Sequence, residues 1–296
     1  MNIETENPVK SASISEKDFA RLSKFIQSVC GIKMPESKKV MLEARLKKRM
    51  RYLGIESFGE YCSYLFSPEG TNGELVHMID VVTTNKTDFF REPKHYDYLV
   101  QTALPELINR HGATIRRKYT VWSAGCSTGE EPYTLAMVLS EFAEKQHRFY
   151  FSILATDIST KVLERARLGI YNEDVVSPVP AGLKIKYLLK NRDKYKRLVR
   201  IAPELRALVE FRRLNFMEGG FGLSEPVDII FCRNVLIYFD RQTQEELLNR
   251  FCRHMHRGGY LFLGHSETIQ GMHVPLIQAA PTVYRKPELY KDVIKP

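Results

Sequence analysis

One stretch of the sequence, YTVWSAGCSTGEEPY at residues 119–133, constrains the fold more than any other. It begins with alternating β-forming residues, such as Tyr119 and Val121, as in a strand. A turn of small residues follows, and then two acids and a proline. Acids complement the dipole of a helix N-terminus, and proline is tolerated in the first helical turn. Apolar residues then recur at helical spacing from Leu135 to Phe142. The stretch therefore predicts a strand, a glycine turn and a helix, the first unit of a nucleotide-binding α/β sheet.

The two glycines of the turn, Gly125 and Gly129, have the spacing G-x-x-x-G, whereas a dinucleotide fingerprint reads G-x-G-x-x-G. Glu130 and Glu131 at the helix start would repel a phosphate, but they suit an ammonium, a sulfonium or ribose hydroxyls. S-adenosylmethionine carries all three groups and no phosphate, so we expect it as the cofactor, with Gly125 and Glu131 among the binding residues. The alternative is that both acids are surface residues that only complement the helix dipole, and it weighs more for Glu130 than for Glu131.

The next predicted strand supports the same cofactor. Residues 149–155 are mostly apolar, as in a buried parallel strand, and Asp157 follows at the strand end. An acid at that place can accept hydrogen bonds from both ribose hydroxyls. The alternative for Asp157 is a helix N-cap, a role that Ser159 can also fill.

The composition of the 296 residues limits the class of protein. The chain is long enough for about two domains. Five scattered cysteines without a C-x-x-C pair favour a reducing compartment over a disulfide framework or a zinc site, so we expect no metal. The polar N-terminus and the lack of an 18-residue apolar run predict a cytoplasmic protein without membrane insertion. A net charge of +9 suggests an acidic partner: nucleic acid, a membrane surface or a protein.

The part before residue 119 contains helical patterns and no strand pattern. We expect disorder at residues 1–14, then a helix that a capping box at 15–18 starts and Gly31 ends. A second helix is expected at 37–53, and short helices near 58–66 and 73–82. Residues 1–82 should therefore form an all-helical domain. The loop 83–92 ends in adjacent phenylalanines, which indicates packing and not a plain linker.

The second predicted helix is strongly basic. Seven basic residues and one acid lie between positions 38 and 51. Lys38, Arg45 and Arg49 fall on one face, beside an apolar stripe that includes Leu42 and Leu46. We expect these three side chains to point outward, either as a solvated face or as an anion-binding face.

After residue 157 the patterns predict a helix at 161–167 and a small antiparallel insertion at about 171–216, which includes 197–201 and 208–212. A strand at 227–232, a helix at 243–255, a turn at 258–259 and a strand at 260–263 resume the α/β alternation. A final strand at 282–285 should pair antiparallel at the sheet edge.

The segment 232–240, CRNVLIYFD, leaves the end of the strand at 227–232. Ligands of open α/β sheets bind beyond the carboxyl ends of the strands, so Arg233, Asn234 and Tyr238 should face the cofactor and substrate. Nucleic-acid enzymes that methylate amino groups usually carry an [N/D]-P-P-[Y/F] segment here, which this chain lacks.

The chain resembles the chemotaxis receptor methyltransferases of the CheR family. The resemblance spans about residues 15–286 and is carried by five motifs in family order: TNKTDFFRE (84–92), WSAGCSTGEEPY (122–133), ATD (155–157), FCRNVLIYF (231–239) and LGHSE (263–267). It implies a doubly wound, Rossmann-like α/β methyltransferase domain at 93–296 with the small β-subdomain inserted, preceded by an all-α domain. It also implies that the loop 83–92 contributes to the cofactor site. The implied contacts with S-adenosylmethionine fall on Asn85, Thr87, Arg91, Glu131, Asp157, Asn215, Phe216, Arg233 and Asn234.

The family methylates glutamate side chains of chemoreceptor cytoplasmic helices, which implies the same acceptor here. A glutamate carboxylate with a reference pKa of about 4.3 is already an anion at neutral pH, so transfer needs no general base. Arg91 and Tyr238 are the expected catalytic residues, holding the carboxylate in line with the methyl–sulfur bond. The alternatives are an ion pair of Arg91 with Glu92 or another acid, and core packing for Tyr238.

The resemblance also gives the basic helix a partner, because receptor methylation helices are acidic. Some family members also bind a receptor C-terminal peptide through a glycine-containing turn of the β-subdomain. The matching turn here, 191–193, has no glycine, so such a tether is in doubt. Two other functions stay open: a methyltransferase for a small molecule or nucleic acid, and a non-catalytic module that binds S-adenosylmethionine.

Overall fold

The computed structural model describes residues 13–111, 118–146 and 148–288. The chain divides between Thr84 and Asn85 into two compact units. Most of the segment expected to be disordered, residues 1–12, lies outside the described residues. Ile14 at the end of that segment is buried.

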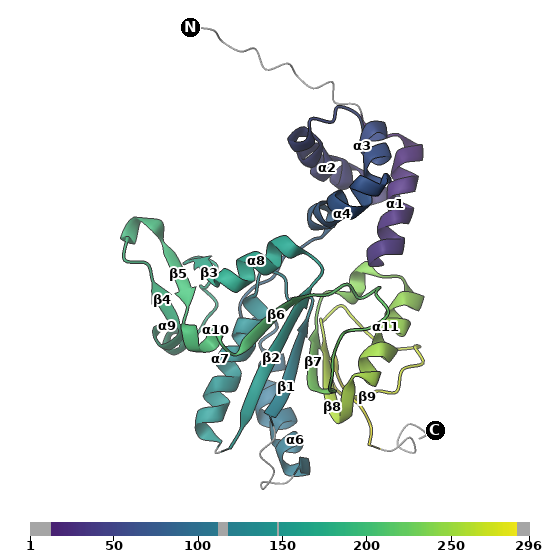
Figure 1. The fold of residues 1–296 in the computed structure, drawn as a ribbon. Coiled ribbons are helices and arrows are strands. Elements are labelled where there is room, and N and C mark those ends of the chain that lie inside the picture. Colours follow the sequence, from purple (N-terminus) through teal and green to yellow (C-terminus); the bar gives the residue numbers. More distant parts are fainter. Residues whose placement is uncertain (1–12, 112–117, 147, 289–296) are drawn as a thin grey trace. The chain divides into compact units, whose positions relative to one another are not determined.

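The first unit is helical (Figure 1). Its elements are α1 (Glu16–Cys30), η1 (Glu36–Lys38), α2 (Lys39–Leu53), α3 (Phe58–Leu65) and α4 (Pro68–Val82). Gly31 and Gly54 end α1 and α2 in the left-handed conformation, as the sequence predicts. Helix α4 starts five residues before the expected Gly73, because the Ser67 side chain caps it and Pro68 occupies its first turn.

The second unit is built on a seven-stranded sheet with the order β6-β2-β1-β7-β8-β10-β9. Strands β6, β2, β1, β7 and β8 run parallel to one another, whereas β10 pairs antiparallel with both β8 and β9. The strands are β1 (Lys118–Ala124), β2 (Tyr150–Asp157), β6 (Val209–Arg213), β7 (Val227–Cys232), β8 (Met255–Leu263), β9 (Ile277–Ala280) and β10 (Val283–Arg285). The helices are α5 (Lys94–Tyr98), a π-helical turn (Leu99–Ala103), α6 (Leu104–His111), α7 (Glu130–Lys145), α8 (Thr160–Leu168) and α11 (Arg241–Arg253).

A small antiparallel sheet lies apart from the main sheet (Figure 1). Its strands are β3 (Ile170–Asn172), β5 (Leu198–Ile201) and β4 (Leu188–Lys190), in that order, with α9 (Ala181–Tyr187), a 3-10 turn (Lys194–Lys196) and α10 (Pro203–Arg206) in the same segment.

Two expectations about strands are wrong. The expected insertion strand 208–212 is β6, which pairs in parallel with β2 and belongs to the main sheet. The final strand β10 is not at the sheet edge, because β9 covers its outer side. Both errors have one cause: alternation indicates a strand, but it does not say which neighbour the strand pairs with.

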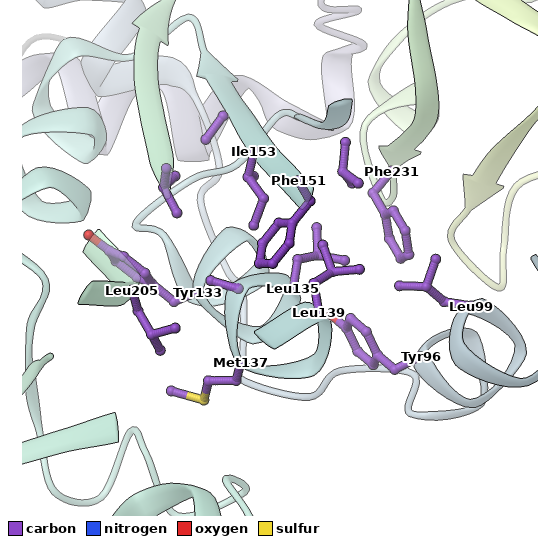
Figure 2. Packing of buried hydrophobic residues seen from close by; sticks show 14 of the residues in the cluster. Tyr96, Leu99, Tyr133, Leu135, Met137, Leu139, Phe151, Ile153, Leu205 and Phe231 are labelled. Carbon is purple, nitrogen blue, oxygen red and sulfur yellow. The ribbon is translucent and has the colours of Figure 1, made fainter. Parts of the chain in front are cut away.

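The core of the second unit joins the sheet to its helices (Figure 2). Leu135 and Leu139 of α7, Phe151 of β2 and Tyr96 of α5 belong to one buried cluster. This packing fixes the sheet and its helices, and the loops at the strand ends are held by that scaffold.

Candidate active site

The strand order reverses between β1 and β7, so their carboxyl ends flank the topological switch point of the sheet. In doubly wound folds the ligand crevice opens at this point. The glycine turn follows β1, Asp157 ends β2, and Asn234 follows β7. The tertiary structure therefore brings the glycine turn, Asp157 and Asn234, which lie in distant segments of the sequence, to the same edge of the sheet.

The glycine turn depends on both of its glycines. Gly125 and Gly129 have φ angles of 89° and 100°, in the left-handed region. A Cβ on Gly125 would lie 2.4 Å from Val235 Cγ2, and one on Gly129 would lie 2.8 Å from the hydroxyl of Tyr171. Both positions need glycine for conformation and for close packing.

Asp157 braces this turn. Its carboxylate accepts from the main-chain N–H of Ser127 at 2.8 Å and from that of Ser159 at 3.0 Å. Ser159 is the N-cap of α8, so the alternative N-cap role for Asp157 is wrong. A buried carboxylate therefore stands at the end of β2, beside the turn that would receive the donor.

The two acids at the start of α7 are buried, so the alternative of plain surface residues is wrong for both. The Glu130 carboxylate accepts from the hydroxyl of Thr128, and burial raises its pKa. The Glu131 carboxylate accepts from Ser123 Oγ and from Arg233 Nε, each at 2.7 Å. Glu131 thus ties the first turn of α7 to the ends of both β1 and β7.

Arg233 is the centre of a buried polar network. Its Nη1 donates to the carbonyl of Arg91 at 2.6 Å and its Nη2 to the hydroxyl of Tyr96 at 2.9 Å, in addition to the Glu131 contact. The guanidinium also lies over the Tyr96 ring. The sequence predicts that Arg233 faces the donor. In the structure its guanidinium donates to Glu131, Arg91 and Tyr96, and these partners compensate the cost of burying its charge.

The loop that carries Arg91 is held in a strained conformation. Phe90 and Glu92 on either side of Arg91 have φ angles of 53° and 55°. Non-glycine residues keep such angles where their surroundings over-determine them. Here the Phe90 N–H donates to Thr134 Oγ1 at 3.2 Å, and Arg233 holds the Arg91 carbonyl. Arg91 itself donates to the Lys86 carbonyl.

Glu92 pairs with groups other than Arg91 among the described contacts. Its Oε2 lies 3.3 Å from His95 Nδ1, 3.6 Å from Arg233 Nη1 and 4.0 Å from His265 Nε2. Two histidines and a carboxylate resemble a metal-ligand set, with ligand atoms within 4.8 Å of one another. However, Arg233 already places a fixed cation against this carboxylate, and it would repel a metal ion. Burial lowers the pKa of His95 to about 3, with the charge of Arg233 adding to the effect.

The segment after β7 carries the other catalytic candidate. Asn234 has a φ angle of 60°, and a 3-10 turn (Leu236–Tyr238) follows it. Tyr238 is half-buried, and its N–H donates to the carbonyl of Val235.

Asn215 and Phe216 follow β6 at the same sheet edge. The Asn215 amide oxygen accepts from the N–H of Met217 at 3.0 Å, and the Phe216 ring packs edge-on against Trp122. The side chain of Arg250 in α11 donates to the Phe216 carbonyl, a support that the sequence analysis missed because α11 is distant in the chain.

The basic residues expected on α2 belong to the other unit, and the expectation that all three point outward is wrong for two of them. Arg45 Nη1 donates to the carbonyls of Val82 at 2.7 Å and Thr83 at 2.9 Å. Arg49 forms a two-pronged ion pair with the buried Glu74, with a shortest contact of 2.6 Å. Both guanidinium groups therefore support α4. Helical spacing correctly placed both arginines beside the apolar stripe. It could not show that α4 and the residue after it supply their partners, the Glu74 carboxylate and the carbonyls of Val82 and Thr83.

Glu267 is a further residue of the site that the sequence analysis did not select as functional. It is buried, and its carboxylate accepts from four main-chain N–H groups, three of them at residues 234–236. The available signal was its place in the LGHSE motif.

These features define a class of protein. A doubly wound sheet, a glycine turn at the switch point and an acid at the end of the second strand are typical of S-adenosylmethionine-dependent methyltransferases. The chain matches the family described as CheR methyltransferase, SAM binding domain, over residues 85–284, and the CheR methyltransferase all-alpha domain over residues 17–83. It therefore belongs to the CheR methyltransferase family.

Curated relatives agree with this assignment over nearly the whole chain. The chemotaxis protein methyltransferase of Borreliella burgdorferi is 42% identical over 275 residues, 93% of this chain and 95% of that protein. The chemotaxis protein methyltransferase of Escherichia coli (strain K12) is 37% identical, over 92% of this chain and 91% of that protein. Chemotaxis protein methyltransferase 2 of Pseudomonas aeruginosa is 38% identical, over 86% and 87%. Within the described residues no helix has the length and apolar character to span a membrane.

Proposed function

We propose that this protein transfers the methyl group of S-adenosylmethionine to glutamate side chains of chemoreceptors, producing glutamate methyl esters and S-adenosylhomocysteine. The observation that carries the proposal is the match to both CheR domains, together with relatives named chemotaxis protein methyltransferases. Sensory adaptation is the process that such methylation serves, and the cytoplasm is the proposed location.

The residues around the switch point support specific roles. Asp157 at the end of β2 would accept from the ribose hydroxyls. Glu131 and Gly125 would line the donor at the glycine turn. The loop 83–92 would add donor contacts from Asn85, Thr87 and Arg91. Asn215, Phe216, Arg233 and Asn234 complete the proposed donor site, in which Arg233 acts through the groups that it holds.

The proposed chemistry needs positioning and no general base. One carboxylate oxygen of the acceptor glutamate forms the new bond to the methyl carbon, and the methyl–sulfur bond breaks with its electron pair going to sulfur. Arg91 and Tyr238 would hold the carboxylate in line with that bond, and alignment of this kind supplies roughly 7–11 kcal/mol. The neighbouring acid Glu92 lies against His95 and Arg233 and not against Arg91, which leaves the Arg91 guanidinium for the acceptor carboxylate in this proposal.

We also propose that α2 docks an acidic receptor helix. Lys38 stays in this proposal, whereas Arg45 and Arg49 would act by fixing the helix. Lys48 and Arg51 are exposed on α2 and would make the contacts with the partner. Val40 and Tyr52 are also exposed, at 78% and 79%, which offers apolar contact beside the charges. A receptor peptide tether on the small sheet is not part of the proposal.

Incubation with radiolabelled donor and receptor-containing membranes tests the function. We expect label in receptor glutamates as methyl esters that mild base releases as methanol. Parallel incubations with DNA, RNA and membranes without receptors test other acceptors. Label in nucleic acid would overturn the proposal, and donor binding without transfer to any acceptor would indicate a non-catalytic module.

A further inference from the structure

The carboxylate of Glu267 lies at the centre of a ring of main-chain N–H groups. Its Oε1 accepts from Val235 at 2.8 Å and from Leu236 at 2.7 Å. Its Oε2 accepts from Asn234 at 2.9 Å and from Gly264 at 2.6 Å. The side chain follows β8, and three of the four donors follow β7. The pairing of Cys232 with Leu263 places these two strand ends side by side.

The three successive donors form an anion-binding nest. Asn234 is left-handed, with a φ angle of 60°, and Val235 has φ −115° and ψ −45°. Alternating conformations of this kind turn consecutive N–H groups toward one point. Burial raises the pKa of Glu267, and its four amide hydrogen bonds oppose that shift by favouring the anion. The nest is therefore filled by a carboxylate of the same chain and is not open to a ligand.

The segment has little room to move on either side. A Cβ on Gly264 would lie 2.7 Å from Asn234 Nδ2 and 2.9 Å from Asn234 N. On the other side, Val235 packs into the space that Gly125 leaves by lacking a side chain. Residues 234–236 are thus clamped between the glycine turn and the end of β8. The clamp continues to Tyr238, because its N–H donates to the Val235 carbonyl.

We propose that Glu267 is a positioning residue for methyl transfer, which sets Asn234 and Tyr238 by fixing the main chain between them. The inference rests on the proposed function, because it takes Asn234 as a donor-binding residue and Tyr238 as a transfer residue. Without the carboxylate, four N–H groups lose their acceptor, three of them at residues 234–236, and Asn234 loses the contact that holds its left-handed conformation. Tyr238 then shifts relative to the methyl group, and a shift of this kind reduces turnover more than it reduces receptor docking.

The variant E267Q tests this inference. In this variant an NH₂ group, which donates hydrogen bonds, replaces one carboxylate oxygen. It would lie against two main-chain N–H groups that need an acceptor. The matched control is E246Q, which removes an exposed carboxylate on α11. Calorimetric titration with S-adenosylhomocysteine counts the intact sites in each preparation, and labelled donor with receptor membranes gives kcat and KM per intact site. We expect kcat of E267Q to fall at least tenfold, with the receptor KM within threefold of wild type and with E246Q unchanged.

A purely structural role would reduce the number of intact sites and the melting temperature, while kcat per intact site stays at the wild-type value. That result would overturn the inference. If E267Q does not fold, E267D is measured in the same way, because the shorter side chain keeps the charge but reaches fewer of the four donors. A reduced kcat per intact site supports the inference, and an unchanged one overturns it. Failure of both variants to fold would also overturn it, by making Glu267 a stability residue. If wild type transfers no label to receptors, the proposed function itself fails.

Discussion

Arg233 Nε donates to the carboxylate of Glu131 at 2.7 Å, which joins the end of β7 to the first turn of α7. Both side chains are buried, and they meet across the switch point where the donor site is proposed. The same guanidinium holds the carbonyl of Arg91. One buried ion pair therefore links three segments that each carry residues of the proposed site.

Removing Glu131 should destabilise the second unit strongly. Loss of one partner from a buried ion pair costs about 3–5 kcal/mol, and the remaining charge of Arg233 would keep only the longer 3.6 Å contact with Glu92. We expect this loss for Glu131→Ala and about 1–2 kcal/mol for the control Glu130→Ala, whose carboxylate accepts from the Thr128 hydroxyl. Urea unfolding followed by fluorescence of Trp122, the single tryptophan of the chain, measures both. Equal losses would show that the Arg233 contact contributes little.

Asp157→Ala should weaken donor binding. The ribose hydroxyls would lose a charged acceptor, and a hydrogen bond to a charged group contributes about 1.5–3 kcal/mol, so the dissociation constant should rise roughly tenfold or more. Calorimetry with S-adenosylhomocysteine measures it, and Asp174→Ala, which removes an exposed carboxylate of the small-sheet segment, is the control. If folded Asp157→Ala binds S-adenosylhomocysteine with unchanged affinity, Asp157 does not bind the ribose hydroxyls.

Tyr238→Phe should reduce turnover more than donor affinity, because the hydroxyl is proposed to act at the incoming carboxylate. We expect kcat to fall tenfold or more, about 1.4 kcal/mol of transition-state stabilisation, with donor affinity within twofold of wild type. Tyr195→Phe, at a 98% exposed position, is the control. Equal losses of turnover and affinity would instead indicate that Tyr238 packs against the cofactor.

His95 should make the second unit less stable in mild acid. The unfolded chain binds a proton at this residue near pH 6.5, whereas burial and Arg233 lower the folded-state pKa to about 3. The unfolded state therefore gains the proton first, and the free energy of unfolding falls with pH from 6.5 toward 3 by about 1.4 kcal/mol per pH unit. Between pH 7.5 and pH 5 the wild type should lose about 2 kcal/mol more than His95→Gln. Urea unfolding of both proteins at the two pH values checks this, and parallel losses would contradict it.

Charge reversal on the exposed face of α2 should impair receptor methylation. An exposed ion pair contributes about 0–1 kcal/mol, so two positions are changed together, as Lys48→Glu with Arg51→Glu. Receptor methylation should fall severalfold while donor binding stays normal. Arg253→Glu with Arg257→Glu makes the same change of net charge on exposed residues of the second unit and serves as the control. Equal activity of the two double variants would show that α2 is a solvated face.

Arg49→Glu is unsuitable for that test. It would place a second acid against Glu74, which is 1% exposed, and would destabilise the helical unit. A loss of methylation in this variant would therefore report unfolding and not docking.

The sequence by itself predicts the helices and strands that carry the proposed site and their order, but it does not predict β9 or α9. Helical and strand periodicities, together with caps such as Ser15, Gly31 and Gly54, are local signals that tertiary contacts did not override. The same holds for the glycine turn and for the acid at the end of β2, because the turn needs left-handed glycines and parallel strands end at one sheet edge.

Tertiary structure alone decided what the charged side chains do. Arg233 and Glu131 are 102 residues apart, and nothing in the sequence indicated the hydrogen bond that the fold forms between them. Arg49 turns to Glu74 on α4, and Glu267 reaches back to the end of β7. These partners are set by which strands and helices become neighbours, as β6 shows by joining β2. The partner of a buried charged side chain therefore depends on which distant strands and helices pack together. The local periodicity of the sequence carries no information about that packing.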